Sequence, residues 1–327
     1  MKITRHIFVC VILLGIFSCE EQGNIPNPSG CVDLPQMHPD CSQGAITYFS
    51  EDTIQFKMPS FNPNNGNEFV YYYINYPQGK KKLIKYDILT NQKTLLVDNI
   101  QVISRLEWGK SGWIAFDSYP DYQIWMIKEN GDSLKQITSS YYNLRPMWDN
   151  EGVNLYWDHD IVLASTPSYF IRINIFTNSL DTVATNRVVV SDISSNNSVV
   201  IGGTNGPAFA QNINYPLDAE SMNLSGSEIG QYNDFTFING GSEVLIASYA
   251  NGFYKYQIDT KSFKKILNYC ESVTYISTDY SPLNNKILVE RNDYRKFITG
   301  CVENTVLKSS IYLLDLNNMQ ETKITLE

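Results

Sequence analysis

Apolar residues in this chain occur in short runs, and polar turns rich in Asn, Gly, Asp and Pro separate these runs. The stretch QIWMIKENGDSLKQIT, residues 123–138, is representative, because a Glu-Asn-Gly-Asp turn divides it into two runs. Runs of five to seven residues with many β-branched and aromatic side chains predict strands, with a helix as the alternative for any single run. The chain is therefore expected to be rich in antiparallel hairpins.

This strand–turn–strand unit recurs along the chain. Similar units begin at Leu83, Phe170, Tyr254 and Ile311. A second signature comes before these hairpins: an aromatic or apolar anchor residue, a polar turn and an apolar strand. The six anchors are Phe61, Trp108, Trp148, Ile193, Phe237 and Tyr280, and successive anchors are 47, 40, 45, 44 and 43 residues apart. The fourth unit is degenerate, because its second hairpin is reduced to INYPLDAESMNL.

Each unit supplies about four short strands. A four-stranded antiparallel sheet that repeats every 40 to 50 residues is typical of a propeller blade, since each sheet buries both faces only against its neighbours. We therefore predict an all-β fold, a six-bladed β-propeller of four-stranded antiparallel blades over residues 49–327. An open solenoid is the alternative architecture.

The stretch at residues 123–138, together with NLRPMWDNEG at residues 143–152, resembles the repeat of TolB-type propellers. The shared pattern is an Ile-aromatic strand, an Asn-Gly turn, a Leu-x-x-Ile-Thr strand, and then Pro, an aromatic residue and a second turn. The resemblance covers about residues 50–327, and it is poor in the fourth unit. It implies an envelope propeller used for binding, and it says little about the ligand because propellers host many activities.

The first 18 residues have the pattern of a secretory signal. Lys2 and Arg5 precede an apolar run, residues 7–17, that is too short to span a membrane. The following IFSC resembles the lipobox of bacterial lipoproteins, which implies cleavage before Cys19 and acylation of its thiol. An ordinary cleaved signal is the alternative.

Two acidic residues, Glu20 and Glu21, come directly after this cysteine. They resemble the export tag that sends some Bacteroidetes lipoproteins to the cell surface. We expect an outer-membrane lipoprotein on the periplasmic or cell-surface side, in contact with the membrane through its lipid anchor only. Residues 19–48 would be the tether, because Pro, Gly, Asn and Ser dominate them.

The charge and composition narrow the possible partners. The net charge of −9 becomes more negative once Lys2 and Arg5 are removed, which argues against nucleic-acid binding. The chain contains 22 Tyr, and tyrosine rings with their hydroxyls suit a protein or glycan partner. We expect an envelope protein or glycan as partner, no cofactor, and a monomer.

Four cysteines remain after the signal and the lipidated residue, and an exported chain is expected to pair them. Cys270 lies in the link to the sixth unit, and Cys301 lies in a long insertion, NDYRKFITGCVENTV, that the blade pattern places on the same face. We therefore predict a Cys270–Cys301 disulfide and, by elimination, a Cys31–Cys41 disulfide. A zinc site is disfavoured, because Cys-x-x-Cys is absent and the three histidines are scattered.

Catalytic signatures are lacking in the sequence. It contains no Gly-x-Ser-x-Gly elbow, Gly-rich phosphate loop or His-Glu-x-x-His motif. The triplet Asp158-His159-Asp160 could ligate a cation, but adjacent residues rarely converge on one ion, and a solvated loop is the alternative. We predict no catalytic or metal-binding residues.

Two arginines occupy equivalent repeat positions. Arg105 and Arg145 each lie three residues before an anchor tryptophan, so they are expected at the mouth of the central channel. They could clamp a carboxylate or phosphate, and a salt-bridge network with Asp234 is the alternative.

We predict that Tyr119, Tyr141, Arg145 and Tyr294 surround a ligand on that face, with Arg105 deeper in the mouth. Packing of these tyrosines between blades is the alternative. The corresponding functions are non-catalytic binding or, as the alternative, a carbohydrate-active lyase or hydrolase, which would need paired carboxylates.

Overall fold

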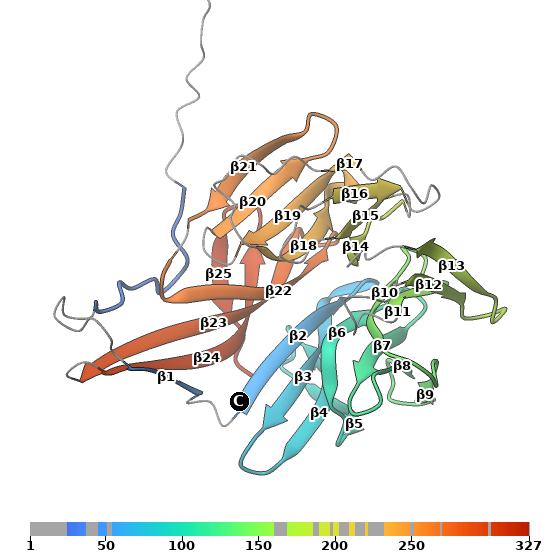
Figure 1. Ribbon diagram of the computed structural model, residues 1–327, viewed down its shortest axis with the longest axis horizontal. Helices are drawn as coiled ribbons and strands as arrows, with labels where there is room; N and C mark the ends of the chain where they lie inside the picture. Colours follow the sequence, from blue (N-terminus) through green and yellow to red (C-terminus); the bar gives the residue numbers. More distant parts are fainter. Residues whose placement is uncertain are drawn as a thin grey trace, which may run out of the picture.

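The computed structural model describes residues 25–36, 45–50, 54–159, 169–185, 190–196, 199–202, 209–212, 220–221, 232–248, 252–268, 270–299 and 302–326. These residues are almost entirely β-structure, and Figure 1 shows their sheets arranged around a common centre. The single helix among them is the short 3₁₀ turn η1 (Asn239–Gly241). The all-β prediction is confirmed.

Five sheets are four-stranded and antiparallel, with their strands in chain order. The first two contain β2 (Ile54–Asn62), β3 (Asn65–Asn75), β4 (Lys80–Asp87) and β5 (Lys93–Asp98), then β6 (Val102–Trp108), β7 (Trp113–Ser118), β8 (Gln123–Lys128) and β9 (Lys135–Gln136). The third and fourth contain β10 (Asn143–Trp148), β11 (Asn154–His159), β12 (Tyr169–Asn174) and β13 (Leu180–Thr185), then β14 (Val190–Ile193), β15 (Val199–Gly202), β16 (Phe209–Asn212) and β17 (Glu220–Ser221). The fifth contains β18 (Tyr232–Ile238), β19 (Glu243–Ser248), β20 (Gly252–Gln257) and β21 (Ser262–Leu267).

The remaining sheet departs from this pattern because it has five strands. It contains β22 (Val273–Ser281), β23 (Lys286–Thr299), β24 (Val302–Asp315), β25 (Gln320–Lys323) and, from the N-terminal region, β1 (Ala45–Ser50). β1 pairs in parallel with β24, whereas the other pairs are antiparallel. The prediction of six four-stranded blades is therefore corrected: the structure has five four-stranded blades, and the last sheet is larger.

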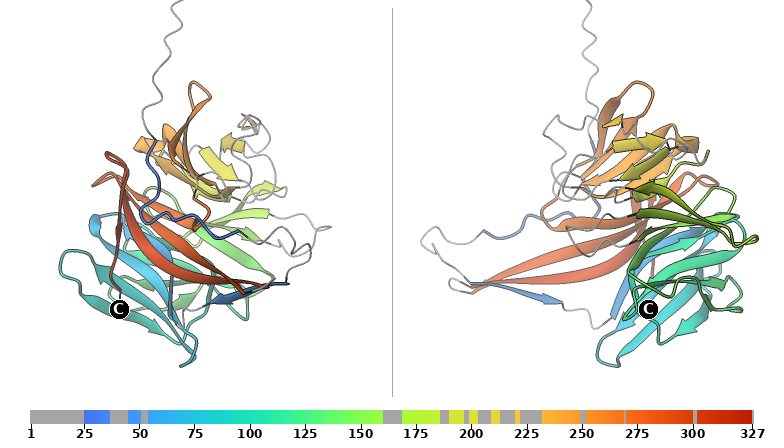
Figure 2. Two further views of the ribbon diagram at one scale, coloured as in Figure 1. Left: turned by 90° about the vertical axis from the view of Figure 1, so that its left-hand side faces the viewer. Right: turned by 45° about the vertical axis from the view of Figure 1, so that its right-hand side comes forward.

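The long insertion that the sequence places in the sixth unit forms part of two paired strands. β23 and β24 stay paired from Lys286 and Asp315 out to Thr299 and Val302. The long hairpin extends beyond the ring, and β1 lies along it (Figure 2).

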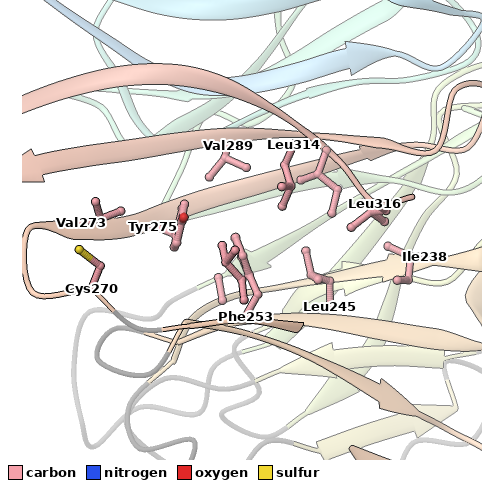
Figure 3. Packing of buried hydrophobic residues seen from close by; sticks show 12 residues of the cluster. Ile238, Leu245, Phe253, Cys270, Val273, Tyr275, Val289, Leu314 and Leu316 are labelled. Carbon is pink, nitrogen blue, oxygen red and sulfur yellow. The ribbon is translucent and has the colours of Figure 1, made fainter. Parts of the chain in front are cut away.

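The innermost strands close a ring. β2 contacts β6, β6 contacts β10, β10 contacts β14, β14 contacts β18, β18 contacts β22, and β22 contacts β2. Buried side chains fill the wedges between neighbouring sheets, as in the cluster where Leu245 and Phe253 meet Tyr275, Val289 and Leu314 (Figure 3). Each sheet thus buries its faces against its neighbours, which is the stabilising principle of a propeller.

The N-terminal segment, residues 25–36, is docked on the fifth and last sheets. The backbone N–H of Asn268 donates to Pro26 O at 2.9 Å, and the backbone N–H of Val32 donates to Ser272 Oγ at 3.1 Å. This course brings Cys31 to Cys270, and the two form a disulfide.

The predicted pairs Cys31–Cys41 and Cys270–Cys301 are therefore wrong. The sequence argument treated the N-terminal segment as a free tether, whereas residues 25–36 follow the link between β21 and β22. Cys41 and Cys301 lie outside the described residues, as do residues 1–24 with the predicted signal and Cys19. In the described part of the chain, no helix is long and apolar enough to cross a membrane.

Candidate functional site

The innermost strands are irregular at one equivalent place. Each loses its pairing register there, and the shifts fall at Lys57/Ser60, Val102/Leu106, Leu144/Met147, Val190/Asp192, Tyr232/Asp234 and Tyr275/Ser277. Such bulges turn side chains and backbone N–H groups out of the ladder. Residues at these bulges line a cavity of about 270 Å³ at one mouth of the central channel.

Arg105 and Arg145 both line this cavity, so the structure brings the two predicted arginines together. Carboxylates already engage each of them. Arg105 Nε lies 2.9 Å from Glu107 Oε2, and its NH2 atom lies 3.8 Å from Asp192 Oδ1. Arg145 NH1 lies 3.6 Å from Asp158 Oδ2. Salt bridges at the mouth are thus present, but they differ from the predicted alternative: the described partners are Glu107, Asp192 and Asp158, whereas Asp234 Oδ2 accepts the backbone N–H of Thr278 at 2.7 Å. Ligand binding by these arginines stays a prediction.

Acidic residues beside the channel join neighbouring blades. Glu107 Oε1 accepts the backbone N–H of Trp148 at 3.1 Å, and Asp192 Oδ2 accepts that of Phe237 at 2.7 Å. Each acceptor directly precedes the anchor residue of its own blade.

In two further blades, the residue before the anchor also accepts a backbone N–H of the neighbouring blade. Asp279 Oδ2 accepts the backbone N–H of Phe61 at 2.5 Å, and Ser60 Oγ accepts that of Trp108 at 3.0 Å. The sequence analysis did not identify these acceptors, although each of them directly precedes an anchor residue and has a side-chain oxygen.

Burial changes the ionisation of these groups. It raises the pKa of Glu107, Asp192 and Asp279 to about 7 each, because an ion loses hydration there, and Arg105 opposes the shift. Burial alone would lower the pKa of Arg105, but the surrounding carboxylates raise it. Burial likewise raises the pKa of Asp158 to about 7. The channel wall thus holds carboxyl groups that titrate near neutral pH around a fixed guanidinium.

One carboxylate orders the rim between the second and third blades. The buried Asp117 accepts the backbone N–H of Ser104 at 2.9 Å through Oδ1 and that of Arg145 at 3.1 Å through Oδ2. Arg145 has a φ of 57°, a left-handed conformation that is costly for a residue with a Cβ atom. Asp117 therefore stabilises a strained backbone next to the cavity.

Beside this rim lies a group of tyrosines, which we call the tyrosine platform: Tyr119, Tyr122, Tyr141 and Tyr142. The ring centroids of Tyr119 and Tyr122 are 5.7 Å apart, and those of Tyr122 and Tyr142 are 4.8 Å apart. Tyr119 is 49% exposed and Tyr141 is 66% exposed, so their rings face solvent. Tyr122 and Tyr141 also have positive φ angles, of 53° and 61°.

Buried amides hold the loop that carries the platform. Gln123 Nε2 donates to the backbone oxygen of Tyr141 at 2.7 Å, and Asn143 Nδ2 donates to Gln123 Oε1 at 3.2 Å. Asn143 Oδ1 also accepts from Trp157 Nε1 at 2.9 Å and lies 2.8 Å from His159 Nδ1. These contacts fix the exposed rings on a rigid base.

The predicted tyrosines therefore separate into two groups. Tyr119 and Tyr141 lie on the platform, exposed rather than packed between blades. Tyr294 lies on β23, where its backbone N–H donates to Ser272 O at 2.8 Å. None of the three lines the cavity that contains Arg105 and Arg145. Tyr122 and Tyr142 were not among the predicted ligand residues, although they lie in the same two segments as Tyr119 and Tyr141.

The Asp158-His159-Asp160 triplet does not converge. Successive residues of β11 point to opposite faces of the sheet. Asp158 faces Arg145, and His159 faces Asn143 and the ring of Tyr141, while Asp160 lies outside the described residues. Within the described residues, no group of three or more His, Cys, Asp or Glu side chains is placed to hold a metal ion.

No protein-family model matches the sequence, and no curated protein matches it at significant similarity. Solved structures do match the fold. Regucalcin from Agrobacterium tumefaciens, described as a calcium-binding protein, superposes with a TM-score of 0.53 at 11% identity over 75% of this chain and 87% of that chain. An oligogalacturonate lyase in complex with manganese superposes with a TM-score of 0.52 at 11% identity over 65% of this chain and 68% of that chain.

TolB from Acinetobacter baumannii is similar at 12% identity, with a TM-score of 0.49 over 83% of this chain and 68% of that chain. Identities this low show the fold alone. The molecule is a β-propeller built largely from four-stranded antiparallel blades. Its structural neighbours include a lyase and a protein described as calcium-binding, so the fold does not define its activity.

Proposed function

We propose that the protein is a non-catalytic binding propeller that holds a glycan on the tyrosine platform, at the rim of the channel mouth. The observation that carries this proposal is the placement of exposed tyrosine rings on a buried, hydrogen-bonded base whose Asn143 lies on β10, the strand that also carries Arg145. Rigid aromatic rings provide contact area at little entropic cost, and each adds a hydroxyl.

A glycan suits this surface better than a flat protein partner. Sugar rings present apolar C–H faces that stack on tyrosine, and their hydroxyls pair with polar groups at the rim. The adjacent cavity of about 270 Å³ contains both charge signs, in Arg105, Arg145, Asp234 and Glu290, and could accept one polar substituent of the sugar.

We further propose that the chain is exported and anchored to the outer membrane through lipid on Cys19. The sequence of residues 1–21 supports this proposal. The disulfide between Cys31 and Cys270 also suits an oxidising compartment outside the cytoplasm.

A carbohydrate-active enzyme is the second candidate, and the buried carboxyl groups with a pKa near 7 favour it. Glu107, Asp192 and Asp279 each accept a backbone N–H of the neighbouring blade, which gives them a structural role. Binding without catalysis is therefore the simpler function.

The test is a glycan array probed with the wild type and with the Tyr119→Ala/Tyr141→Ala double variant. Loss of two stacking rings should weaken binding by about tenfold or more. Phe176→Ala is the matched control, since Phe176 is also exposed, at 66%, but lies on the turn between β12 and β13.

Unchanged binding by the double variant, with circular dichroism showing a folded protein, would contradict the platform site. Failure of every glycan while an envelope protein binds would contradict the glycan assignment. Cleavage products, detected by mass spectrometry after incubation with a bound glycan, would contradict the non-catalytic proposal.

A further inference from the structure

A second, larger cavity of about 740 Å³ lies between the first blade and the five-stranded sheet. Its apolar lining comes from β2, β3 and β4 on one side and from the C-terminal residues on the other. The lining includes Phe56, Tyr71, Tyr73, Ile84, Ile324 and Leu326. We call this cavity the interblade groove, and it shares no lining residue with the channel-mouth cavity.

Three lysines, Lys93, Lys308 and Lys323, line the interblade groove, and none of its described lining residues is acidic. This concentration of positive charge contrasts with the net charge of −9. Lys93 Nζ donates to the backbone oxygen of Leu326 at 2.8 Å, which ties the C-terminal wall of the groove to the first blade. The charge therefore favours an anionic occupant.

Among its described lining residues, the groove has no carboxylate or side-chain amide to pair with the hydroxyls of a sugar. Besides the lysines, its polar side-chain groups are the hydroxyls of Tyr71, Tyr73, Ser309, Ser310 and Thr325. Tyr73 already accepts from Asn75 Nδ2, and Ser309 already donates to the backbone oxygen of Phe56. A sugar would leave polar groups without partners on the aromatic and aliphatic lining, whereas an aliphatic chain would bury apolar surface there.

We propose that the interblade groove binds a free long-chain aliphatic carboxylate, with the chain against the apolar lining and the carboxylate near the lysines. Its volume is within the range of about 300–1,000 Å³ that is common for small-ligand sites. This site is independent of the proposed glycan site, because it shares no lining residue with the channel-mouth cavity or the tyrosine platform and uses a different chemistry.

Isothermal titration with laurate, below its critical micelle concentration, tests the proposal. The full chain carrying Cys19→Ala is suitable, because it has no thiol to acylate at that position and needs no detergent. Lys308→Glu/Lys323→Glu should weaken laurate binding by about tenfold or more. Lys80→Glu/Lys264→Glu is the matched control, since it reverses two charges outside the groove.

Uncharged 1-dodecanol separates the role of the chain from that of the charge, and its affinity should be unchanged in Lys308→Glu/Lys323→Glu. Ile84→Trp, which fills the groove, should reduce the binding of both laurate and dodecanol. Absence of laurate binding to the Cys19→Ala chain, or equal binding by all variants, would overturn the proposal. Binding to phosphatidylcholine vesicles without binding to monomeric laurate would also overturn it, because the surface would then recognise a bilayer.

Discussion

Arg291 is the most informative residue to perturb, because it joins the N-terminal segment to the last sheet. The residue is only 2% exposed. Its NH2 atom lies 2.6 Å from Asp293 Oδ1 and donates to Ser29 O at 2.7 Å, and its NH1 atom lies 2.8 Å from Glu321 Oε2. The guanidinium carbon lies 4.2 Å from the centroid of the Tyr312 ring. Arg291→Met keeps much of the side-chain volume and removes the charge.

Arg291→Met should lower the free energy of unfolding, because the buried carboxylate of Glu321 loses its partner. Breaking a buried ion pair by removing one partner typically costs about 3–5 kcal/mol, since the other charge stays desolvated and unpaired. Total stabilities are about 5–15 kcal/mol, so this substitution should remove a large fraction. Arg172→Met is the matched control: Arg172 pairs with Asp181 at 2.8 Å, but the side chains are 34% and 50% exposed. Its expected loss is about 0.2–1 kcal/mol.

Urea unfolding of the full chain, followed by both circular dichroism and tryptophan fluorescence, measures the two losses. The double variant Arg291→Met/Glu321→Gln should recover part of the loss, because it removes the stranded charge. If Arg291→Met costs no more than Arg172→Met, the N-terminal segment is not held as the structure shows, and the reasoning from burial fails.

Two further predictions concern pH and anchoring. Because burial raises the pKa of Glu107, Asp192 and Asp279 to about 7 in the folded state, these groups bind more protons when folded than when unfolded between about pH 4 and pH 7. Their contribution to the free energy of unfolding should therefore be fully present below about pH 4 and lost as the pH rises through 7. Urea unfolding at several pH values measures this, and midpoints that rise from pH 5 to pH 8 would contradict it. Metabolic labelling with a fatty acid should mark the wild type but not the Cys19→Ala variant. The unlabelled variant should also move to the soluble fraction. A wild type that takes up no label would contradict the lipid anchor.

The repeat pattern predicted most of the fold, because each blade is formed by strands and turns that are close together in the sequence. Anchors such as Trp108 and Trp148 are buried where the period places them, and the short fourth unit is a sheet of short strands. The period also placed Arg105 and Arg145 in one cavity. Equivalent positions in successive repeats share a location, so sequence spacing was enough for these features.

Features that depend on contacts between distant segments could not be predicted. The Cys31–Cys270 disulfide joins residues that are 239 positions apart, and its formation depends on docking of the N-terminal segment. The addition of β1 to β24 likewise uses residues outside the repeat. Tyr294 was expected near the ligand at the channel mouth, but it lies on β23, whose pairing with β24 continues along the extended hairpin. Nothing local in these segments specifies their partners.

The division between channel and rim explains why a binding site at the rim is the better hypothesis. Glu107, Asp192 and Asp279 are already committed to joining blades, so a reaction that changed their protonation would also disturb the ring. At the rim, by contrast, Tyr141 and Arg145 hold unfavourable backbone conformations that Gln123 and Asp117 stabilise. Backbone strain that is held in place by buried side chains is characteristic of ligand-binding sites, and here it lies beside exposed tyrosine rings. The tyrosine platform, rather than the channel interior, is therefore where substitutions should change binding while the fold is retained.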